Sequence, residues 1–492
     1  MKKIINIVSV LFGAMLLLSS CSEDMKILQE HPKKAGAESF MTNYESAQAE
    51  INAIYHQMHR LEAYGRYLIV LTEGLSDYCW GRGNYASSYE TGLTSGGQGF
   101  SRDAWAVQYR CIRFANSFMR QIGNATLTKK EYGELTGEIR FLRALAYSQL
   151  IKYYGGVPFF TEDNMDDFNK PRTPADEIWQ YIEDECKYAY DNLPAAVSQV
   201  GRPTKYAAAM LRGEAALYLK HYAVAQEAFE WVISSKRYSL VSVKKADDFI
   251  KVYGPDVVTT SEEVFYIKYN RDRADEFFWM YVCSPNPVRD TGALGIYTDL
   301  VRNKVIAGWD PNDFRFQWDL YRQTQNGTLN GLTDNGMICF KYRDTEATGS
   351  TSAIDNPVYR YADALLYAAE ARAKALGAPD ATALNYVNMV RRRAYGFSTG
   401  SASSVDYLLA DNSTIDAFME TVLKERAYET CFEGKRYADL KRLGKLAEYA
   451  VKAGKIESES DVKDAAYWWP IPTNEYNYNT ALDPTVDQNP GY

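Results

Sequence analysis

Two adjoining helices rich in small side chains, expected between residues 205 and 235, restrict the fold of this chain more than any other segment. In the first helix, small and apolar residues recur at steps of three and four, at Ala208, Leu211, Ala215 and Tyr218. The second helix continues the same spacing with Ala225, Phe229 and Val232. Such spacing places each set on one helix face. Because each helix must bury that face, we expect the two to pack as an antiparallel hairpin.

The small and aromatic residues of this hairpin agree with the tetratricopeptide pattern at four positions, which are Gly213, Tyr222, Ala225 and Phe229. In that pattern, small residues let the paired helices approach each other and the aromatic side chain fills the remaining gap. A second small-residue helix is predicted over 359–373, with a partner over 383–394. The sequence therefore predicts a repeated hairpin, which is the basis of a helical scaffold.

Two further helices are predicted outside these hairpins. Residues 136–154 carry an apolar stripe that ends at Gly155 and Gly156, as expected of a helix C-terminus. Another helix is predicted from Ile415 to about Leu446. The predicted fold class is mainly α, with tetratricopeptide-like helical hairpins forming a scaffold.

Two regions of different composition interrupt the helices, one over 76–101 and one over about 244–351. Both are rich in Gly, Asn, Asp and aromatic residues, which favours irregular loops with a few short strands. Long loop-rich insertions on a regular scaffold are usually functional. We therefore expect the binding residues of this protein in these two regions.

The N-terminus has the pattern of a lipoprotein signal peptide. Lys2 and Lys3 precede an apolar stretch over 4–18, which ends in Leu-Ser-Ser-Cys21. A run of about 15 apolar residues is too short for a permanent membrane-spanning helix, which is the alternative reading. We expect residues 1–20 to be removed and Cys21 to be acylated, which would anchor the chain to a membrane.

The charge disfavours nucleic acid as a partner, and the cysteine spacing disfavours a disulfide framework. The formal net charge is −8, and it becomes −10 once the two signal lysines are removed, without long blocks of one sign. This balance disfavours nucleic acid as a partner. The remaining cysteines are scattered without a Cys-x-x-Cys pair, so buried thiols are expected rather than a disulfide framework. No cofactor is predicted.

Several ordered motifs resemble those of one known family, the SusD-like (RagB/SusD) nutrient-binding outer-membrane lipoproteins. They are Arg140-Phe-Leu-Arg-Ala-Leu-Ala-Tyr, Tyr154-Gly-Gly-Val-Pro, Cys431-Phe-Glu-Gly-Lys-Arg-Tyr-Ala-Asp-Leu-Lys-Arg442, Trp469-Pro-Ile-Pro-Thr-Asn-Glu475 and Gln488-Asn-Pro-Gly-Tyr492. The resemblance spans the whole mature chain and implies an N-terminal region over 21–235 and a C-terminal region over 236–492, which contains the insertion. The acidic Ser22-Glu23-Asp24 resembles an export signal to the outer face of the outer membrane, although a solvated linker has the same composition.

The resemblance implies a helical lid on a TonB-dependent outer-membrane transporter, which binds glycans or sometimes peptides without chemistry. The expected function is capture of an oligosaccharide and its delivery to that transporter, with the protein lipid-anchored in the outer membrane and facing the exterior. Three alternatives stay open at this point: peptide or glycopeptide capture, a lipid-anchored hydrolase, and a subunit that mainly gates or scaffolds the transporter. Common enzyme motifs are absent, but the paired carboxylates of glycosidases are defined in space rather than in sequence.

Aromatic and planar polar side chains gather in both insertions, and this combination is typical of sugar recognition. A pyranose ring offers an apolar C–H face to an aromatic plane, while its hydroxyls need planar polar partners. The aromatic and amide candidates are Trp80, Asn84, Tyr85, Trp279 and Trp309, with Asp77 and Arg82 as polar partners. The resemblance implies the same two regions as the ligand site.

Two other groups of polar residues have simpler explanations. Charges of both signs recur on the predicted C-terminal helix, at Glu425, Arg426, Glu433, Arg436, Asp439 and Arg442. Because arginine forms fork-shaped pairs with carboxylates when partly buried, we expect a structural ion-pair network. His56 and His59 are three residues apart, but no third ligand is evident nearby, so no metal site is predicted.

Overall fold

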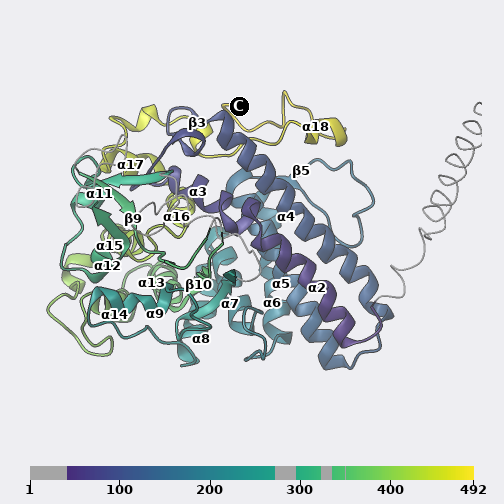
Figure 1. The fold of residues 1–492 in the computed structure, drawn as a ribbon, viewed down its shortest axis with the longest axis horizontal. Helices are drawn as coiled ribbons and strands as arrows, with labels where there is room; N and C mark the ends of the chain where they lie inside the picture. The colour runs from purple at the N-terminus through teal and green to yellow at the C-terminus, as the bar shows by residue number, and fades with distance from the viewer. Residues whose placement is uncertain (1–40, 272–294, 323–334, 349–350) are drawn as a thin grey trace, which may run out of the picture.

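The computed structural model describes residues 41–271, 295–322, 335–348 and 351–492. Helices dominate these parts, as predicted, and the strands are few and short (Figure 1). The long helices are α2 (Tyr44–His59), α4 (Ser95–Gln121), α5 (Lys129–Tyr154), α6 (Ala175–Asn192), α7 (Lys205–Tyr218), α8 (Tyr222–Ser234), α13 (Tyr361–Leu376), α14 (Ala381–Ala394) and α15 (Ile415–Glu429). The shorter ones are α3 (Tyr67–Gly74), α9 (Ile250–Tyr253), α11 (Lys304–Ala307), α12 (Phe314–Asp319), α16 (Arg436–Arg442), α17 (Leu446–Lys452) and α18 (Glu475–Tyr478).

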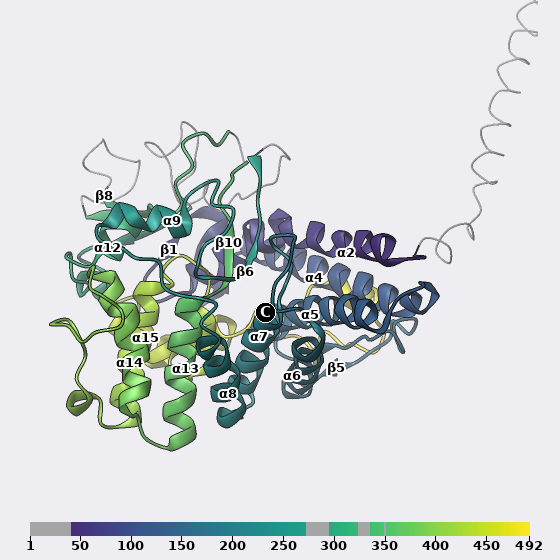
Figure 2. The ribbon, with the colours of Figure 1, turned by 90° about the horizontal axis from the view of Figure 1, so that it is seen from below.

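The helices α5, α6, α7, α8, α13 and α14 pack in this order as one continuous array (Figure 2). Helices α8 and α13 are neighbours in the array although a long segment separates them in the sequence. The rings of Phe229 in α8 and Tyr367 in α13 stack with centroids 5.3 Å apart. The predicted hairpin over 205–235 is confirmed as α7 and α8. A Cβ atom on Gly213 would lie 2.6 Å from Cζ of Phe229, so the small residue is required for the close approach.

Helix α5 ends at Tyr154, as predicted, but begins at Lys129, seven residues before the predicted start. The Thr128 side chain accepts a hydrogen bond from the backbone N–H of Glu131, whose carboxylate accepts one from the backbone of Thr128. This capping box satisfies N–H groups that lack partners within the helix. The helix ends at Tyr154, after which Gly155 has φ +75°, a conformation that favours glycine. The helix starts earlier than its apolar stripe because its first turn is polar.

The strands form a four-stranded antiparallel sheet of order β1-β7-β9-β8 and three two-stranded pairs. The sheet consists of β1 (Trp80–Gly81), β7 (Ile296–Asp299), β9 (Gly336–Cys339) and β8 (Leu320–Arg322). The pairs are β6 (Glu263–Ile267) with β10 (Asn356–Arg360), β2 (Ser87–Ser88) with β3 (Gly92–Leu93), and β4 (Val157–Pro158) with β5 (Arg172–Thr173). The sheet joins the two insertions, because β1 comes from the first and the other three strands from the second.

The prediction of one helix from Ile415 to about Leu446 is wrong. Helix α15 ends at Glu429 and α16 begins only at Arg436. Between them, Phe432 and Gly434 have φ +63° and φ +73°, which no α-helix allows. The Gly434 N–H donates to the Glu73 carboxylate at 2.6 Å, so the break docks this turn on α3.

The first irregular region also ends earlier than predicted. Helix α4 begins at Ser95 instead of after Ser101, because the Thr94 hydroxyl accepts from the Gly97 N–H at 3.2 Å and caps the helix. The three glycines over 96–99 lie inside its first turns. Their high frequency favoured a loop in the sequence, whereas the cap and the tertiary packing make the segment helical.

The predicted ion-pair network of the C-terminal charges is confirmed. The pairs are Glu425–Arg315 (2.7 Å), Arg426–Asp439 (2.8 Å), Glu433–Arg360 (2.6 Å), Arg436–Asp77 (2.7 Å) and Arg442–Glu370 (2.5 Å). Each of these side chains is at most 5% exposed. Buried charges must be paired, and here each arginine meets a carboxylate.

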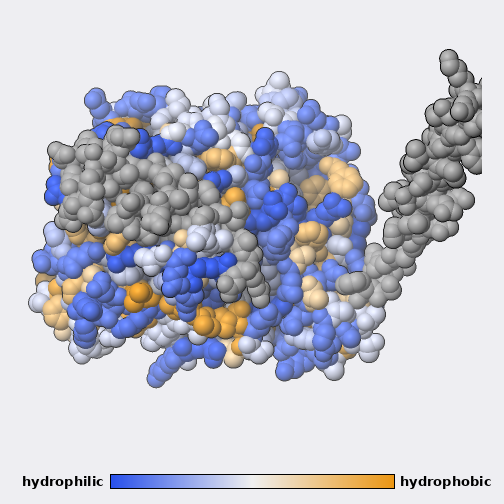
Figure 3. Space-filling view, in the orientation of Figure 1, coloured by the Kyte–Doolittle hydropathy of each residue, from blue (hydrophilic) through white to orange (hydrophobic). Residues whose placement is uncertain are grey.

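All five described cysteines are buried, as predicted, and Cys283 lies outside the described residues. No helix in the described ranges has the length and apolar character needed to cross a membrane. Polar residues cover most of the face seen in Figure 3, and apolar residues form small scattered groups on it.

Candidate functional site

Trp80 lies at the start of the sheet that joins the two insertions. It follows α3 and pairs with Tyr297 of β7 in antiparallel register. The two rings stack with their centroids 6.0 Å apart and their planes 27° apart, and both side chains are partly exposed. Pairing between two short strands therefore places two aromatic rings side by side at the surface.

Two cations approach the Trp80 ring. The Arg302 guanidinium lies 5.2 Å and the Lys455 amino group 5.6 Å from the ring. Cations over an aromatic face are attracted by its negative potential. Arg302 is exposed, so it adds hydrogen-bond donors beside the ring. The Trp80–Tyr297 pair thus combines flat apolar faces with a planar polar group.

A second aromatic group lies close by in the sequence and is formed by Tyr67, Tyr85 and Phe100, which we call the ring stack. Phe100 stacks on Tyr67 at 4.4 Å and on Tyr85 at 5.6 Å, with planes 27° and 25° apart. Arg66 completes the group, because its guanidinium lies 4.7 Å from the Tyr67 ring and donates to the Tyr85 hydroxyl at 3.3 Å. All four side chains are partly exposed.

The first loop continues between these two groups. Arg82 is partly buried, and its backbone N–H donates to the carbonyl of Gly295 at 2.8 Å. Asn84 is exposed in the turn of 3-10 helix η2 (Gly83–Tyr85). A Cβ atom on Gly96 would lie 2.6 Å from Cγ of Asn84, so the amide rests directly on the start of α4. The structure therefore brings Trp80, Arg82, Asn84 and Tyr85 together on one loop.

The base of this loop is held from the C-terminal part of the chain. The Lys455 amino group donates to the carbonyl of Ser76 at 2.6 Å and also to that of Cys79. Burial lowers the pKa of Lys455 to about 8. The Tyr89 hydroxyl donates to the carbonyl of Leu75 at 2.8 Å. These bonds fix the backbone on which the exposed rings stand.

Asp77 and Trp309 were expected to contact the ligand, but the structure places both side chains in the interior. Asp77 is 0% exposed and binds Arg436 through both carboxylate oxygens. Trp309 is 2% exposed and stacks on Tyr428, with centroids 4.4 Å and planes 6° apart. Neither side chain reaches the surface, so both have structural roles. Trp279 lies outside the described residues, as does the predicted lipidation site Cys21.

Sequence reasoning missed five residues of the site, which are Arg66, Tyr67, Phe100, Tyr297 and Arg302. Phe100 lies in the same glycine-rich region as Tyr85, so the composition of this region could have indicated it. Tyr67 lies on a helix, where an aromatic residue is usually assigned to the core. Tyr297 and Arg302 lie in the second predicted insertion, but the sequence does not show that the fold brings them to Trp80.

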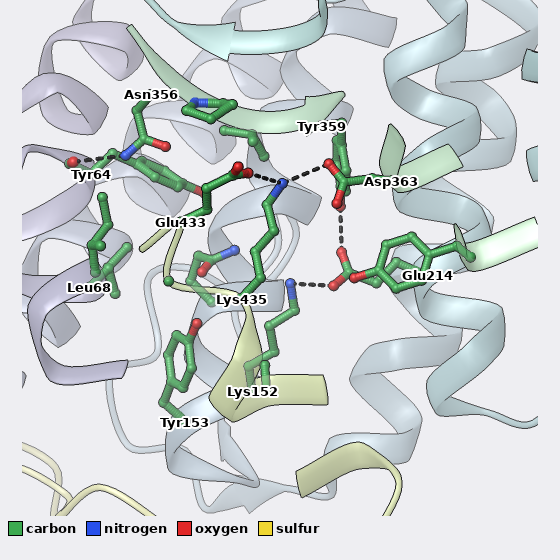
Figure 4. A pocket seen from close by; sticks show the side chains of 17 residues that line it. Tyr64, Leu68, Lys152, Tyr153, Glu214, Asn356, Tyr359, Asp363, Glu433 and Lys435 are labelled. Atoms are coloured by element: carbon green, nitrogen blue, oxygen red, sulfur yellow. Dashed lines mark hydrogen bonds and ion pairs between the residues drawn. The ribbon is translucent and has the colours of Figure 1, made fainter. Parts of the chain in front are cut away.

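A small cavity of ≈ 70 Å³ lies between α3, α5, α7 and α13 and is lined by several charged side chains (Figure 4). Lys152 pairs with Glu214 at 2.7 Å, and Lys435 pairs with Asp363 at 2.6 Å and with Glu433 at 3.1 Å. Ligand pockets typically measure about 300–1,000 Å³. The cavity is too small for such a ligand and its charges satisfy one another, so its role is to join the two halves of the fold.

No group of three or more side chains suited to hold a metal ion occurs in the ranges that the structure describes. His56 and His59 lie at the end of α2, where His59 meets the edge of the Tyr269 ring at 5.4 Å. His59 thus belongs to an aromatic surface with Tyr269.

Two family models match the chain. The model described as "SusD family" matches residues 302–492, and the model described as "Starch-binding associating with outer membrane" matches residues 28–213. A SusD-like protein of Formosa agariphila is 26% identical over 512 residues, which cover 97% of this chain and 98% of that protein.

Solved structures show the same fold. A SusD homolog from Bacteroides thetaiotaomicron superposes with a TM-score of 0.77 at 22% identity, over 94% of this chain and 100% of that one. A laminarin binding SusD-like protein superposes with a TM-score of 0.71 at 21% identity. Surface glycan-binding protein A from Bacteroides thetaiotaomicron also superposes with a TM-score of 0.71, at 20% identity. Both matches cover 92% of this chain and 100% of the other.

Proposed function

Because this chain belongs to the SusD-like family, we propose that it is a cell-surface glycan-binding lipoprotein that captures an oligosaccharide and delivers it to a TonB-dependent outer-membrane transporter. The observation that carries the proposal is the partly exposed aromatic surface formed by Trp80, Tyr297 and the ring stack. Two proteins of similar structure are named as a laminarin binding protein and a surface glycan-binding protein.

The chemistry of this surface suits a saccharide. The ring planes offer apolar faces to the C–H face of a pyranose, and Arg66, Arg82 and Asn84 supply planar polar groups for its hydroxyls. Each aromatic contact contributes about 0.5–1.5 kcal/mol beyond burial. Micromolar affinity needs about 8 kcal/mol. Several rings must therefore act together, which favours an extended oligosaccharide over a single sugar.

The surroundings of the rings favour binding over catalysis. Glycoside hydrolysis needs two carboxyl groups about 5–10 Å apart that face the substrate. The carboxylate that precedes Trp80 most closely in sequence, Asp77, is fully buried and occupied by Arg436. Its role in the proposed function is to hold the loop, and the ligand is bound without being changed.

The anchor at Cys21 has a mechanistic role in this proposal. A tethered binder stays beside its transporter at a high effective concentration, so modest affinity is sufficient for capture. Acylation at Cys21 would leave the helical scaffold outside the membrane, with the aromatic surface available to glycans. The outer-membrane location and the exterior orientation form part of the same proposal.

The test uses the soluble chain that begins at Ser22, titrated by calorimetry with a panel of neutral oligosaccharides and with a peptide library. We expect at least one oligosaccharide to bind with micromolar affinity and the peptides not to bind. Binding of peptides without binding of any saccharide would contradict the proposal. Release of new reducing ends from a bound glycan would contradict the assignment as a binding protein.

A further inference from the structure

A large open cavity lies apart from the aromatic loop. It measures ≈ 860 Å³ and is lined by the C-terminal half of α2, the loop over 199–202, the segments over 256–258 and 266–271, and residues next to the start of β10. The end of α2 lies beside the β6–β10 pair there (Figure 2). It shares no lining residue with the surface formed by Trp80, Tyr297 and the ring stack. Its volume is in the range of ligand pockets.

A second cavity of ≈ 460 Å³ adjoins the first. The two share the wall formed by Val200, Gly201, Arg202 and Tyr266. Gly201 has φ +92°, and a Cβ atom on it would lie 2.9 Å from Cγ of Lys268. The shared wall is therefore a tight turn pressed against β6 and its continuation, which makes the pair of cavities a preformed feature of the backbone. We call the two together the α2–β6 cleft.

The cations of the larger cavity are neutralised by carboxylates. Lys268 uses its three N–H groups on Glu263 (2.7 Å), Asp355 (2.8 Å) and the carbonyl of Val258 (3.1 Å). Arg202 donates to the Glu138 carboxylate at 2.7 Å. A charged ligand would have to displace such a pair, and breaking a buried pair is strongly unfavourable. The lining is thus suited to an uncharged ligand.

The guanidinium groups of Arg202 and Arg271, which also line the larger cavity, are bonded to neighbouring side chains. Arg202 donates to Asn52 at 2.8 Å and to Gln199 at 2.6 Å. Arg271 pairs with Asp256 at 2.7 Å and with Asp344 at 3.0 Å. Both guanidinium groups are held in place by these bonds. They therefore shape the cavity and do not act as mobile anion receptors.

Rings and hydroxyl groups also line the α2–β6 cleft. The larger cavity is lined by the rings of Tyr55, His56, His59 and Tyr269. The smaller cavity is lined by the hydroxyl residues Thr204, Tyr238, Thr259, Thr260 and Ser261. The Oγ1 atom of Thr260 and the Oη atom of Tyr266 are buried without a hydrogen-bond partner in the described ranges. Buried hydroxyls usually complete their hydrogen bonds with water or with a ligand.

We propose that the α2–β6 cleft is a second saccharide site, which takes a neutral oligosaccharide across the shared wall at Gly201. The assignment of the ligand class rests on the proposed glycan-binding function. The site itself rests on the volume, the aromatic and hydroxyl lining and the pairing of Arg202, Lys268 and Arg271 with carboxylates in the larger cavity. Two sites on one chain would hold a long glycan at two points, and bivalent attachment raises the overall affinity above that of either site.

The test compares three variants of the soluble chain by calorimetry with the panel of neutral oligosaccharides. Val200→Trp places a bulky ring on the shared wall, and it should fold normally because Val200 is 44% exposed. Val486→Trp is the matched control, because Val486 is 77% exposed and does not line the cleft. Trp80→Ala weakens the site on the aromatic loop.

We expect two binding sites for a short oligosaccharide in the wild type and in Val486→Trp. Val200→Trp should lower the affinity of one site at least tenfold, and Trp80→Ala that of the other. If the wild type has one site that only Trp80→Ala weakens, the second site is refuted while the proposed function stands. If Val200→Trp alone weakens binding, the second site stands and the aromatic loop is refuted.

Two further outcomes would also overturn the inference. Binding of no neutral saccharide by the wild type would overturn both sites. Binding of an anionic oligosaccharide or a peptide that Val200→Trp abolishes, in the absence of neutral-saccharide binding there, would refute the ligand class and with it the proposal.

Discussion

Arg436 binds both carboxylate oxygens of Asp77, with Nε 2.9 Å from Oδ1 and Nη2 2.7 Å from Oδ2, across 359 residues of sequence. Both side chains are at most 1% exposed. The pair joins the C-terminal helix α16 to the base of the aromatic loop. The exposed rings of the proposed glycan site therefore depend on a contact that lies beneath them.

Removal of one partner of this pair should destabilise the fold strongly. Asp77→Ala leaves Arg436 buried without its carboxylate, which typically costs about 3–5 kcal/mol. Urea unfolding of the soluble chain measures the change. Asp163→Ala is the control, because Asp163 is exposed and a surface change of this kind stays within about 0.5 kcal/mol. A loss for Asp77→Ala no larger than that of the control would show that the pair does not hold the loop.

Glu73 should make the stability depend on pH. Burial raises the pKa of Glu73 from its usual 4.5 to about 7. A carboxyl whose folded pKa is raised contributes stability below pH 4.5, and this contribution is lost as the pH rises through about 7. Glu73→Gln stays neutral and can still accept from Gly434 and Tyr78, which bond the wild-type carboxylate.

The free energy of unfolding of Glu73→Gln should therefore increase relative to the wild type between pH 4.5 and pH 7 and stay constant above. Chemical unfolding of both proteins at pH 5, 6, 7 and 8 gives the comparison. A difference that does not change with pH would contradict the raised pKa of Glu73.

The helix hairpin α7–α8 allows a matched test of its packing. Gly213→Ala would place Cβ 2.6 Å from the Phe229 ring, and such overpacking costs about 1–3 kcal/mol. Gly99→Ala lies in α4 with no atom within 4 Å of its Cβ, so it should stabilise by about 0.5–1 kcal/mol. Thermal unfolding should shift in opposite directions for the two variants. A shift of the same sign for both would contradict the hairpin geometry.

Trp309 should matter for stability and not for ligand binding. It is buried against Tyr428, and truncation of a buried tryptophan typically costs about 3–5 kcal/mol. At a temperature where Trp309→Ala remains folded, its affinity for an oligosaccharide should equal that of the wild type. Calorimetric titration after the fold is checked by circular dichroism measures this. A weaker affinity in the folded variant would return Trp309 to the ligand site.

The helices could be predicted from the sequence because their signals are local. Gly213 and Phe229 lie on adjacent helices, and their tetratricopeptide spacing predicts that these helices are in contact. The break at Phe432 and Gly434 could not be predicted in this way. It depends on the docking of this turn on Glu73, which is 361 residues away in the sequence.

The site was predicted only in part for the same reason. Composition indicates that Trp80, Asn84 and Tyr85 lie in one glycine-rich loop, and the structure brings them together. Composition does not separate an exposed ring from one that packs inside a loop. Trp80 and Trp309 both lie in predicted insertions, yet Trp80 stacks at the surface and Trp309 is buried. The sequence does not show this difference, because the partner rings, Tyr297 and Tyr428, lie far away in the sequence.

The affinity of Trp80→Ala for a neutral oligosaccharide tests the central claim most directly. Calorimetric titration of the soluble chain that begins at Ser22 should give a dissociation constant at least about tenfold higher than for the wild type, which corresponds to about 1.4 kcal/mol. Circular dichroism and the unfolding midpoint should show that the variant remains folded. If every dissociation constant is unchanged in a folded Trp80→Ala variant, the assignment of the aromatic loop as a glycan-binding site is contradicted.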